Sequence, residues 1–97
     1  MHAVDENFED SRQAAHFLRS TLMELGASDV QLLPSGPGTN PIVLGTFHAP
    51  HPRKRCLFYG HYDCVPAGDG WDSDPWDLCG RDGYLYGRGV SDNKGPI

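Results

Sequence analysis

The sequence predicts an α/β fold, in the form of the beginning of an α/β sandwich. Three observations support this prediction. One segment repeats its apolar residues at helical spacing, and three short apolar segments, separated by loops rich in glycine and proline, are typical of strands. Pro96 suits the first turn of a further helix. The predicted helix comprises residues 8–25, and the predicted strands comprise residues 29–33, 42–47 and 55–60.

The helix prediction depends on one apolar stripe. Its members recur every three or four residues, which places them on one side of a helix and predicts that this side is buried. Asn7 can cap the N-terminal end. Gly26 follows at a position where helices commonly end, because glycine accepts left-handed backbone angles. The predicted stripe consists of Ala14, Phe17, Leu18, Leu22 and Leu25.

The predicted strands differ in the cover that they need. Residues 29–33 and 42–47 are short, with a loop rich in proline and glycine between them. Residues 55–60 are almost continuously apolar, as expected for a strand that is covered on both faces. Farther along, Asp82 and Gly83 lie between two apolar segments, which predicts a hairpin with positive φ angles in its turn.

Composition limits the classes of function. The 97-residue chain has 13 acidic and 8 basic residues and a net charge of -5, which argues against nucleic acid or a membrane surface as partner. No apolar run is long enough for a membrane span, and the polar N-terminus does not resemble a signal peptide. The three cysteines form no Cys-x-x-Cys pair, so free thiols in a reducing compartment, the cytoplasm, are expected.

His61 and Asp63 are the first candidate site residues. They follow the predicted strand 55–60 directly, and sites in α/β folds gather at the carboxyl ends of strands. Residues two apart in an extended chain point to the same side, and a metal-binding histidine usually donates its second ring N–H to a carboxylate. The pair alone has two interpretations: a metal ligand with its orienting carboxylate, or a structural histidine beside a surface aspartate.

Other motifs in the chain are incomplete. The segment around Ser91 lacks the second glycine of a nucleophile elbow, and Lys94 lacks the flanking residues of a phosphate-binding loop. No H-E-x-x-H zinc helix is present. His48 and His51 lie among prolines without a third ligand nearby, so they are interpreted as part of a surface turn. Cys64 adjoins the candidate pair, but no ligand spacing supports it as a metal ligand.

The second half of the chain contains a series of spaced motifs: Gly60-His61-Tyr62-Asp63, Trp71, Asp74-Pro75-Trp76, Asp82-Gly83, Leu85-Tyr86-Gly87-Arg88-Gly89 and Asp92-Asn93-Lys94-Gly95. In this order they resemble the di-zinc metallopeptidase family that includes carnosinases, aminoacylases and acetylornithine deacetylase. The local match is to the dipeptidase branch of that family, which includes peptidases of glutathione breakdown. Asn93 stands where many members have a second aspartate.

The resemblance implies roles for three residues. His61 matches a ligand of one zinc ion, Asp63 matches the carboxylate that orients this histidine and is counted with the catalytic residues, and Asp92 matches the carboxylate that bridges both zinc ions. Two Zn²⁺ ions per complete site are therefore the expected cofactors. In the family, the remaining ligands and the glutamate that accepts a proton from the bridging water follow Asp92, and this chain does not contain them. The resemblance also implies a cis peptide bond between Asp92 and Asn93.

These implications give an expected function and an alternative. Residues 1–97 are expected to be the N-terminal part of one metallopeptidase catalytic domain, as a partial α/β/α sandwich of a zinc-dependent exopeptidase. The expected activity is hydrolysis of an amide bond in a dipeptide or small peptide, with a complex or dimer formed through regions outside the chain. The isolated chain is expected to be inactive and to expose apolar surface. The alternative is a non-catalytic subunit that uses this fold as an interaction scaffold.

Overall fold

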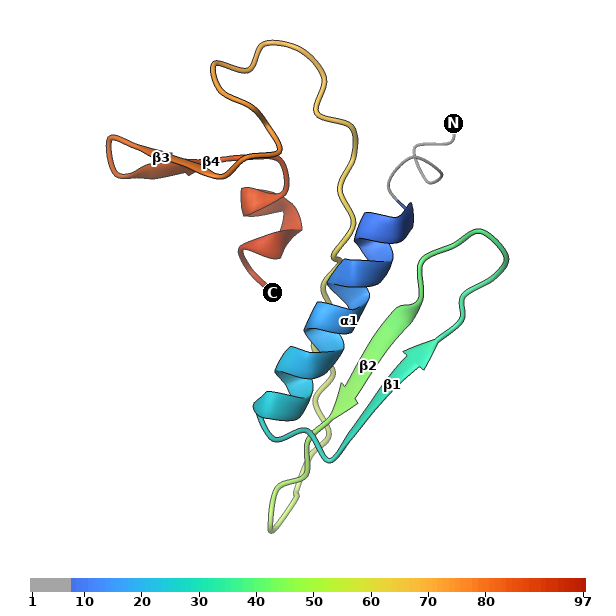
Figure 1. The fold of residues 1–97 in the computed structure, drawn as a ribbon. Helices are drawn as coiled ribbons and strands as arrows, with labels where there is room; N and C mark the ends of the chain where they lie inside the picture. The colour runs from blue at the N-terminus through green and yellow to red at the C-terminus, as the bar shows by residue number, and fades with distance from the viewer. Residues whose placement is uncertain (1–7) are drawn as a thin grey trace. The chain divides into compact units, whose positions relative to one another are not determined.

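The structure, a computed structural model, describes residues 8–97, and the chain divides into two compact units (Figure 1). The first unit extends to Phe58, and the second comprises Tyr59–Ile97. Asn7, the predicted cap of the first helix, lies outside the described residues. Of the helices in the described part of the chain, none has the length and apolar character that a membrane crossing requires.

Helix α1 comprises Phe8–Glu24, close to the predicted segment, and it ends in a Schellman cap. Gly26 has a left-handed φ of 96°. Its N–H donates to the carbonyl oxygen of Met23 at 3.1 Å, and the N–H of Ala27 donates to the carbonyl oxygen of Leu22 at 3.0 Å. These two bonds satisfy carbonyl groups that the helix leaves unpaired, and they confirm Gly26 as the end of the helix.

Strands β1 (Asp29–Leu33) and β2 (Ile42–Thr46) form an antiparallel hairpin at the predicted positions. Their pairing runs from Asp29 opposite Thr46 to Leu33 opposite Ile42. In the loop between the strands, the hydroxyl of Ser35 donates to the carbonyl oxygen of Asn40 at 2.5 Å. This bond draws the two ends of the loop together, so the register of the hairpin is fixed close to its turn.

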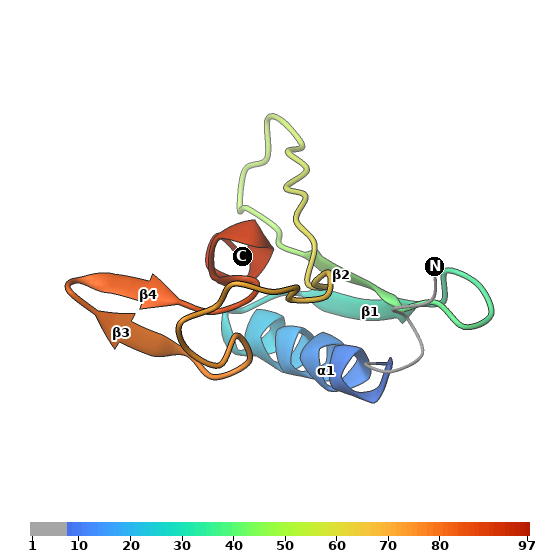
Figure 2. The ribbon, with the colours of Figure 1, turned by 90° about the horizontal axis from the view of Figure 1, so that it is seen from above.

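Helix α1 lies on one face of the β1–β2 hairpin (Figure 2). Ala15 on this face is completely buried, and a Cβ added to Gly45 would lie 3.0 Å from Leu22 Cδ1. Two members of the predicted stripe, Phe17 and Leu25, are instead 70% and 69% exposed. The prediction is wrong for these two residues because a two-stranded hairpin is narrower than the apolar stripe and covers only part of it.

Residues 55–60, the third predicted strand, do not form a strand. A strand requires a neighbour that pairs with its backbone groups, and in the described part of the first unit pairing is confined to β1 and β2. Leu57, Phe58 and Tyr59 are between 85% and 92% exposed. The prediction of a paired strand is therefore wrong for this structure, whereas the expectation of exposed apolar surface is confirmed.

The second unit contains a hairpin of β3 (Cys79–Arg81) and β4 (Tyr84–Tyr86), followed by the short helical turn η1 (Val90–Lys94). Asp82 and Gly83 connect the two strands with φ angles of 51° and 81°. Positive φ at both central residues matches the right-handed twist of a two-residue hairpin. The predicted turn is therefore confirmed.

Helix and strand are mixed along the described chain, as an α/β fold requires. In the first unit, α1 covers one face of a hairpin, which corresponds to two layers of structure. A complete α/β/α sandwich has a third layer of helices, so the complete sandwich stays a prediction.

Candidate metal centre

His61 lies at the centre of a cluster of three residues in the second unit. Its Nδ1 is 3.1 Å from Oδ1 of Asp63, and its Nε2 is 2.8 Å from Oδ1 of Asp92. The structure thus brings together the three residues that the sequence analysis selected, although His61 and Asp92 are 31 positions apart. The side chain of His61 is 40% exposed and that of Asp92 is 86% exposed, so the cluster is open to solvent.

The two contacts of the His61 ring determine its protonation. A carboxylate only accepts hydrogen bonds, so both ring nitrogens must carry protons for both bonds to form. The hydrogen bond to Asp92 raises the pKa of His61 above its ordinary value, and the bond to Asp63 acts in the same direction, while partial desolvation opposes them. The proton on Nε2 occupies the position that a cation would need, because a metal ligand must offer a lone pair.

Asp92 lies within η1, at a point where the backbone leaves the helical path. Its φ of -131° and ψ of 89° are not helical, and Gly89 before it has a left-handed φ of 89°. The turn stays closed because the N–H of Lys94 donates to the carbonyl oxygen of Gly89 at 2.9 Å. The peptide bond between Asp92 and Asn93 is cis, as the family resemblance implied.

Two glycines allow the chain on either side of the cluster to approach closely. A Cβ on Gly60 would collide with the side chain of Ile97 and would lie 2.9 Å from Nδ2 of Asn93. A Cβ on Gly89 would lie 2.6 Å from the Sγ of Cys64, at a backbone angle that other residues rarely adopt. The Gly89 position therefore requires glycine, whereas a Cβ on Gly60 would displace the ends of two side chains, and the Cys64 thiol packs against the Gly89 backbone.

Arg88, which the sequence analysis did not select, anchors the loop that follows Asp63. Its Nη2 donates to the carbonyl oxygen of Ala67 at 2.7 Å, and Nε1 of Trp71 donates to the same oxygen at 3.0 Å. The backbone N–H of Arg88 donates to the carbonyl oxygen of Pro75 at 2.7 Å. Its position between two glycines is visible in the sequence and could have drawn attention to Arg88. Its hydrogen-bond acceptors are backbone carbonyl oxygens, which no sequence motif identifies.

The cluster fits part of a metal site. An imidazole nitrogen and a carboxylate oxygen are both zinc ligands, and Asp63 provides the partner that a metal-binding histidine usually has on its other ring nitrogen. Within residues 8–97, no group of three or more His, Cys, Asp or Glu residues is arranged to hold a metal ion. Since catalytic zinc normally takes three protein ligands, His61 and Asp92 supply part of a site, and their assignment as zinc ligands stays a prediction.

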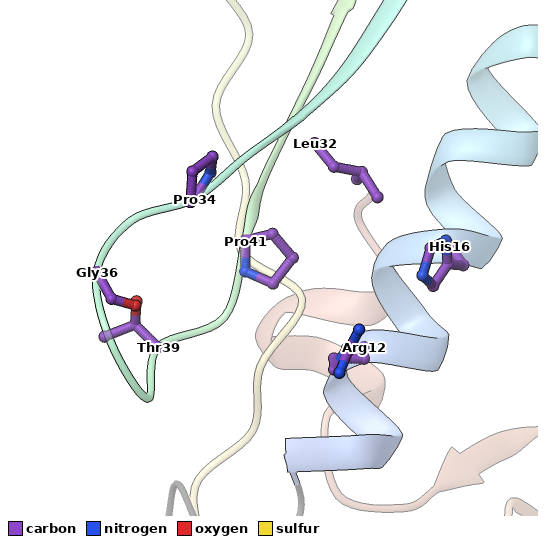
Figure 3. A pocket seen from close by; sticks show the side chains of 7 residues that line it. All are labelled: Arg12, His16, Leu32, Pro34, Gly36, Thr39 and Pro41. Carbon is purple, nitrogen blue, oxygen red and sulfur yellow. The ribbon is translucent and has the colours of Figure 1, made fainter.

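A cavity in the first unit contains none of these residues. It has a volume of about 290 Å³ and lies between α1 and the loop that joins β1 to β2 (Figure 3). Arg12 and His16 of the helix line it on one side, and Pro34 and Thr39 of the loop line it on the other. Of these lining residues only His16 is a common zinc ligand, and a catalytic zinc normally takes three protein ligands, so this cavity is not an alternative metal site.

Comparison with known families relates the cluster to a peptidase. Residues 57–97 match the family described as Peptidase family M20/M25/M40. The matched residues include all three members of the cluster and also Arg88. No solved structure was found to match the chain.

Curated relatives match a longer part of the chain. It is 41% identical over 96 residues to the probable di- and tripeptidase DUG2 of Saccharomyces cerevisiae, covering 89% of this chain and 11% of that protein. It is 42% identical over 87 residues to the Beta-Ala-His dipeptidase of Homo sapiens, covering 79% and 17%. It is 38% identical over 99 residues to the Cys-Gly metallodipeptidase DUG1 of Candida albicans, covering 88% and 20%. The chain thus spans between 11% and 20% of the length of these relatives.

Proposed function

We propose, from the match of residues 57–97 to peptidase family M20/M25/M40, that the chain is part of a member of this family and that the full protein hydrolyses an amide bond in a dipeptide or similarly small peptide, with zinc as its metal. The observation that supports the proposal most is the position of His61 between Asp63 and Asp92. These three residues lie within the segment that matches the family. The names of the relatives, which describe peptidases of dipeptides and tripeptides, support the size of the substrate.

Each residue of the cluster has a distinct task in this proposal. His61 would hold the metal through an unprotonated Nε2, and Asp63 would keep the proton on Nδ1 and so fix the ring. Asp92 has two carboxylate oxygens, so it can face two cations at once. Zinc bound there would supply a water molecule of lowered pKa and would polarise the amide carbonyl of the substrate.

The proposed reaction needs groups beyond those of the described residues. Two zinc ions require more ligands than His61 and Asp92 provide. A group that accepts the proton of the attacking water is also required, and the family resemblance assigns this task to a glutamate that follows Asp92 in the sequence. We therefore propose that residues 1–97 alone neither hydrolyse dipeptides nor bind two zinc ions tightly.

The substrate and compartment follow from the same proposal. Cys-Gly and β-Ala-His are the first dipeptides to test because relatives are named for acting on them, and Cys-Gly would connect the protein to glutathione breakdown. All three cysteines are free in the described residues, which supports a reducing compartment, the cytoplasm. A dimer or a larger complex would form through regions outside residues 1–97.

The test uses the full-length protein that contains this chain, loaded with zinc. Hydrolysis of Cys-Gly, β-Ala-His and a longer peptide is measured for the wild type and for His61→Ala and Asp92→Asn. His51→Ala serves as the control, because His51 is an exposed loop histidine outside the cluster. A chelator should abolish dipeptide hydrolysis, and added zinc should restore it.

The two cluster variants should lose both activity and bound zinc, while His51→Ala should keep both. If the wild-type protein binds zinc but cleaves no peptide, the alternative of a non-catalytic scaffold subunit is favoured. Full activity in His61→Ala would contradict the proposal directly.

A further inference from the structure

We propose that Arg88 is a positioning residue of this site: it holds the loop of residues 64–76 against the segment that leads to Asp92, and thereby sets the approach of His61 to Asp92. The inference deepens the proposed function and rests on it, since positioning matters for catalysis only if the cluster binds metal. It concerns a side chain that does not touch the cluster itself.

Ala67 offers one hydrogen-bond acceptor to two side chains. Its carbonyl oxygen accepts one bond from the Arg88 guanidinium at 2.7 Å and one from the Trp71 indole at 3.0 Å. A carbonyl oxygen has two lone pairs, so both are used. The guanidinium carbon also lies 5.4 Å from the centre of the Trp71 ring, within the range of a cation–π contact. Arg88 and Trp71 thus fix the same point of the loop from two directions.

The other end of the loop is hydrogen-bonded to the backbone of Arg88. The backbone N–H of Arg88 donates to the carbonyl oxygen of Pro75 at 2.7 Å. A Cβ on Gly87 would make an ordinary contact with the same Pro75 oxygen, at 3.7 Å, but a tight one with Cγ2 of Val90, at 3.1 Å, so Gly87 eases the packing of this turn. One residue therefore holds both the early and the late part of the loop.

The order of residues along the chain places Arg88 between this loop and Asp92. The loop begins directly after Asp63, which contacts the His61 ring, and Arg88 comes shortly before Asp92, which contacts the other side of that ring. Arg88 therefore joins the two chain segments that carry the cluster. The contacts of Arg88 thus add to the cluster's own bonds and to the close packing at the glycines.

The chemistry of the side chain explains why arginine suits this position. The planar guanidinium group can stack on an aromatic ring and donate a directed hydrogen bond at the same time. A lysine has a single nitrogen, so it keeps the positive charge but cannot make both contacts in the same geometry. Arg88→Lys should therefore restore only part of what Arg88→Ala removes.

The experiment compares Arg88→Ala, Arg88→Lys and a matched control in the zinc-loaded full-length protein. The control is Arg81→Ala, because Arg81 also stacks on an aromatic ring, 4.5 Å from the centre of Tyr86, but lies within the β3–β4 hairpin. Zinc affinity, kcat and KM for the best dipeptide, and the absorption spectrum of the cobalt-substituted protein are measured. Hydrogen exchange of peptides that cover residues 64–76 reports the loop independently of activity.

Arg88→Ala should lower zinc affinity or kcat measurably, but by less than the roughly tenfold to 100-fold loss that follows removal of a group bonded directly to a metal ligand, because Arg88 acts through the loop. Its cobalt spectrum should change, and hydrogen exchange in the loop should become faster. Added guanidinium ions, at concentrations far below those that unfold proteins, should recover part of the activity of Arg88→Ala. Arg81→Ala should match the wild type in every measurement.

Arg88→Lys keeps the inference testable if Arg88→Ala does not fold, and it should lie between the wild type and Arg88→Ala. An unchanged cobalt spectrum and unchanged kcat in a folded Arg88 variant would overturn the inference. So would equal effects of the Arg88 and Arg81 variants. If the wild-type protein has neither zinc nor activity, the proposed function fails, and hydrogen exchange alone then decides whether Arg88 holds the loop.

Discussion

His61 is held between two carboxylates that differ in their tasks. Asp92 approaches Nε2 at 2.8 Å, and Asp63 approaches Nδ1 at 3.1 Å. In the proposed metal site a cation would replace the proton on Nε2, so the bond to Asp63 could persist, whereas Asp92 would exchange its hydrogen bond for a metal bond. Changes to the two aspartates should therefore have different consequences.

Asp63→Asn should weaken zinc binding or activity of the full-length protein by about tenfold to 100-fold without abolishing either. The amide oxygen of asparagine still accepts a hydrogen bond from Nδ1–H, but it lacks the charge that makes the ring a better metal ligand. Competition with a chromophoric chelator measures the affinity. Asp69→Asn is the control, because Asp69 is an exposed loop carboxylate, and a similar loss in that variant would contradict the assignment of Asp63.

The raised pKa of His61 predicts a pH dependence. In the metal-free protein the bonds of the protonated ring stabilise the fold below the ordinary pKa of histidine, and this contribution is lost as the pH rises through the raised pKa. Metal binding, if His61 is the proposed ligand, should show the opposite trend, because the metal would have to displace the proton from Nε2. Zinc affinity should rise with pH by up to about tenfold per pH unit below the pKa of His61 and level off above it.

Titration of zinc at several pH values measures this slope, and His51→Ala should leave it unchanged. An affinity that is flat from pH 5 to pH 8, where an ordinary or a raised histidine pKa would be crossed, would show that His61 is not a ligand.

At the scale of elements, several short segments have the structure that their local sequence predicts. The end of α1 at Gly26, the positions of β1 and β2 and the turn at Asp82 and Gly83 were predicted because each depends on the backbone preferences of a few neighbouring residues. Residues 55–60 were predicted wrongly, since a strand also depends on a partner that its own sequence does not specify. The prediction that Phe17 of α1 is buried was wrong for the same reason, because burial also depends on a partner surface.

The residues of the candidate site also differ in how far the sequence predicted them. Spacing made His61 and Asp63 candidates, because two residues in an extended segment share a side of the chain, but it left a structural histidine as the alternative, and the family resemblance supplied the roles. Asp92 came from the family resemblance, since no local rule connects positions 31 residues apart. Arg88 was not found, because its partners at Ala67 and Pro75 are main-chain oxygens, which every residue possesses.

The turn that carries Asp92 gives a prediction at this scale. Gly89 and Gly70 have almost equal left-handed φ angles, 89° and 86°, but only Gly89 has a neighbour where its Cβ would lie, Cys64 Sγ at 2.6 Å. Gly70→Ala should cost about 1–2 kcal/mol for the backbone angle alone. Gly89→Ala should cost more, since the turn must also move away from the thiol.

Thermal unfolding and zinc content of the full-length protein measure the two effects. Zinc content should fall in Gly89→Ala and stay at the wild-type level in Gly70→Ala. Equal losses in both variants would mean that the contact with Cys64 does not position the Asp92 turn.

At the scale of the whole molecule, little apolar surface is removed from water. Ala15 is the only fully buried apolar residue in the described part of the chain, and large side chains in both units are more than half exposed. Burial of apolar area is the main term that offsets the loss of chain entropy on folding. A chain with so small a core should have low stability by itself.

The isolated chain of 97 residues should therefore self-associate, and the exposed segment with Leu57, Phe58 and Tyr59 should be the main cause. Phe58→Ser should reduce association, because Phe58 is 92% exposed. Phe17→Ser is the matched control, since Phe17 is also exposed but belongs to a formed helix. Light scattering at several protein concentrations measures the effect, and equal behaviour of the two variants would contradict the assignment.

The contact between His61 and Asp92 has a further consequence, for the entropy of the unfolded chain. A cation bound by both residues would act as a reversible cross-link that closes a loop spanning 31 positions. A covalent bridge across a loop of that length lowers the entropy of the unfolded state, which raises its free energy by about 3–4 kcal/mol. Removal of zinc should then release the whole stretch between the two residues, and hydrogen exchange across the β3–β4 hairpin should quicken along with the loss of catalysis.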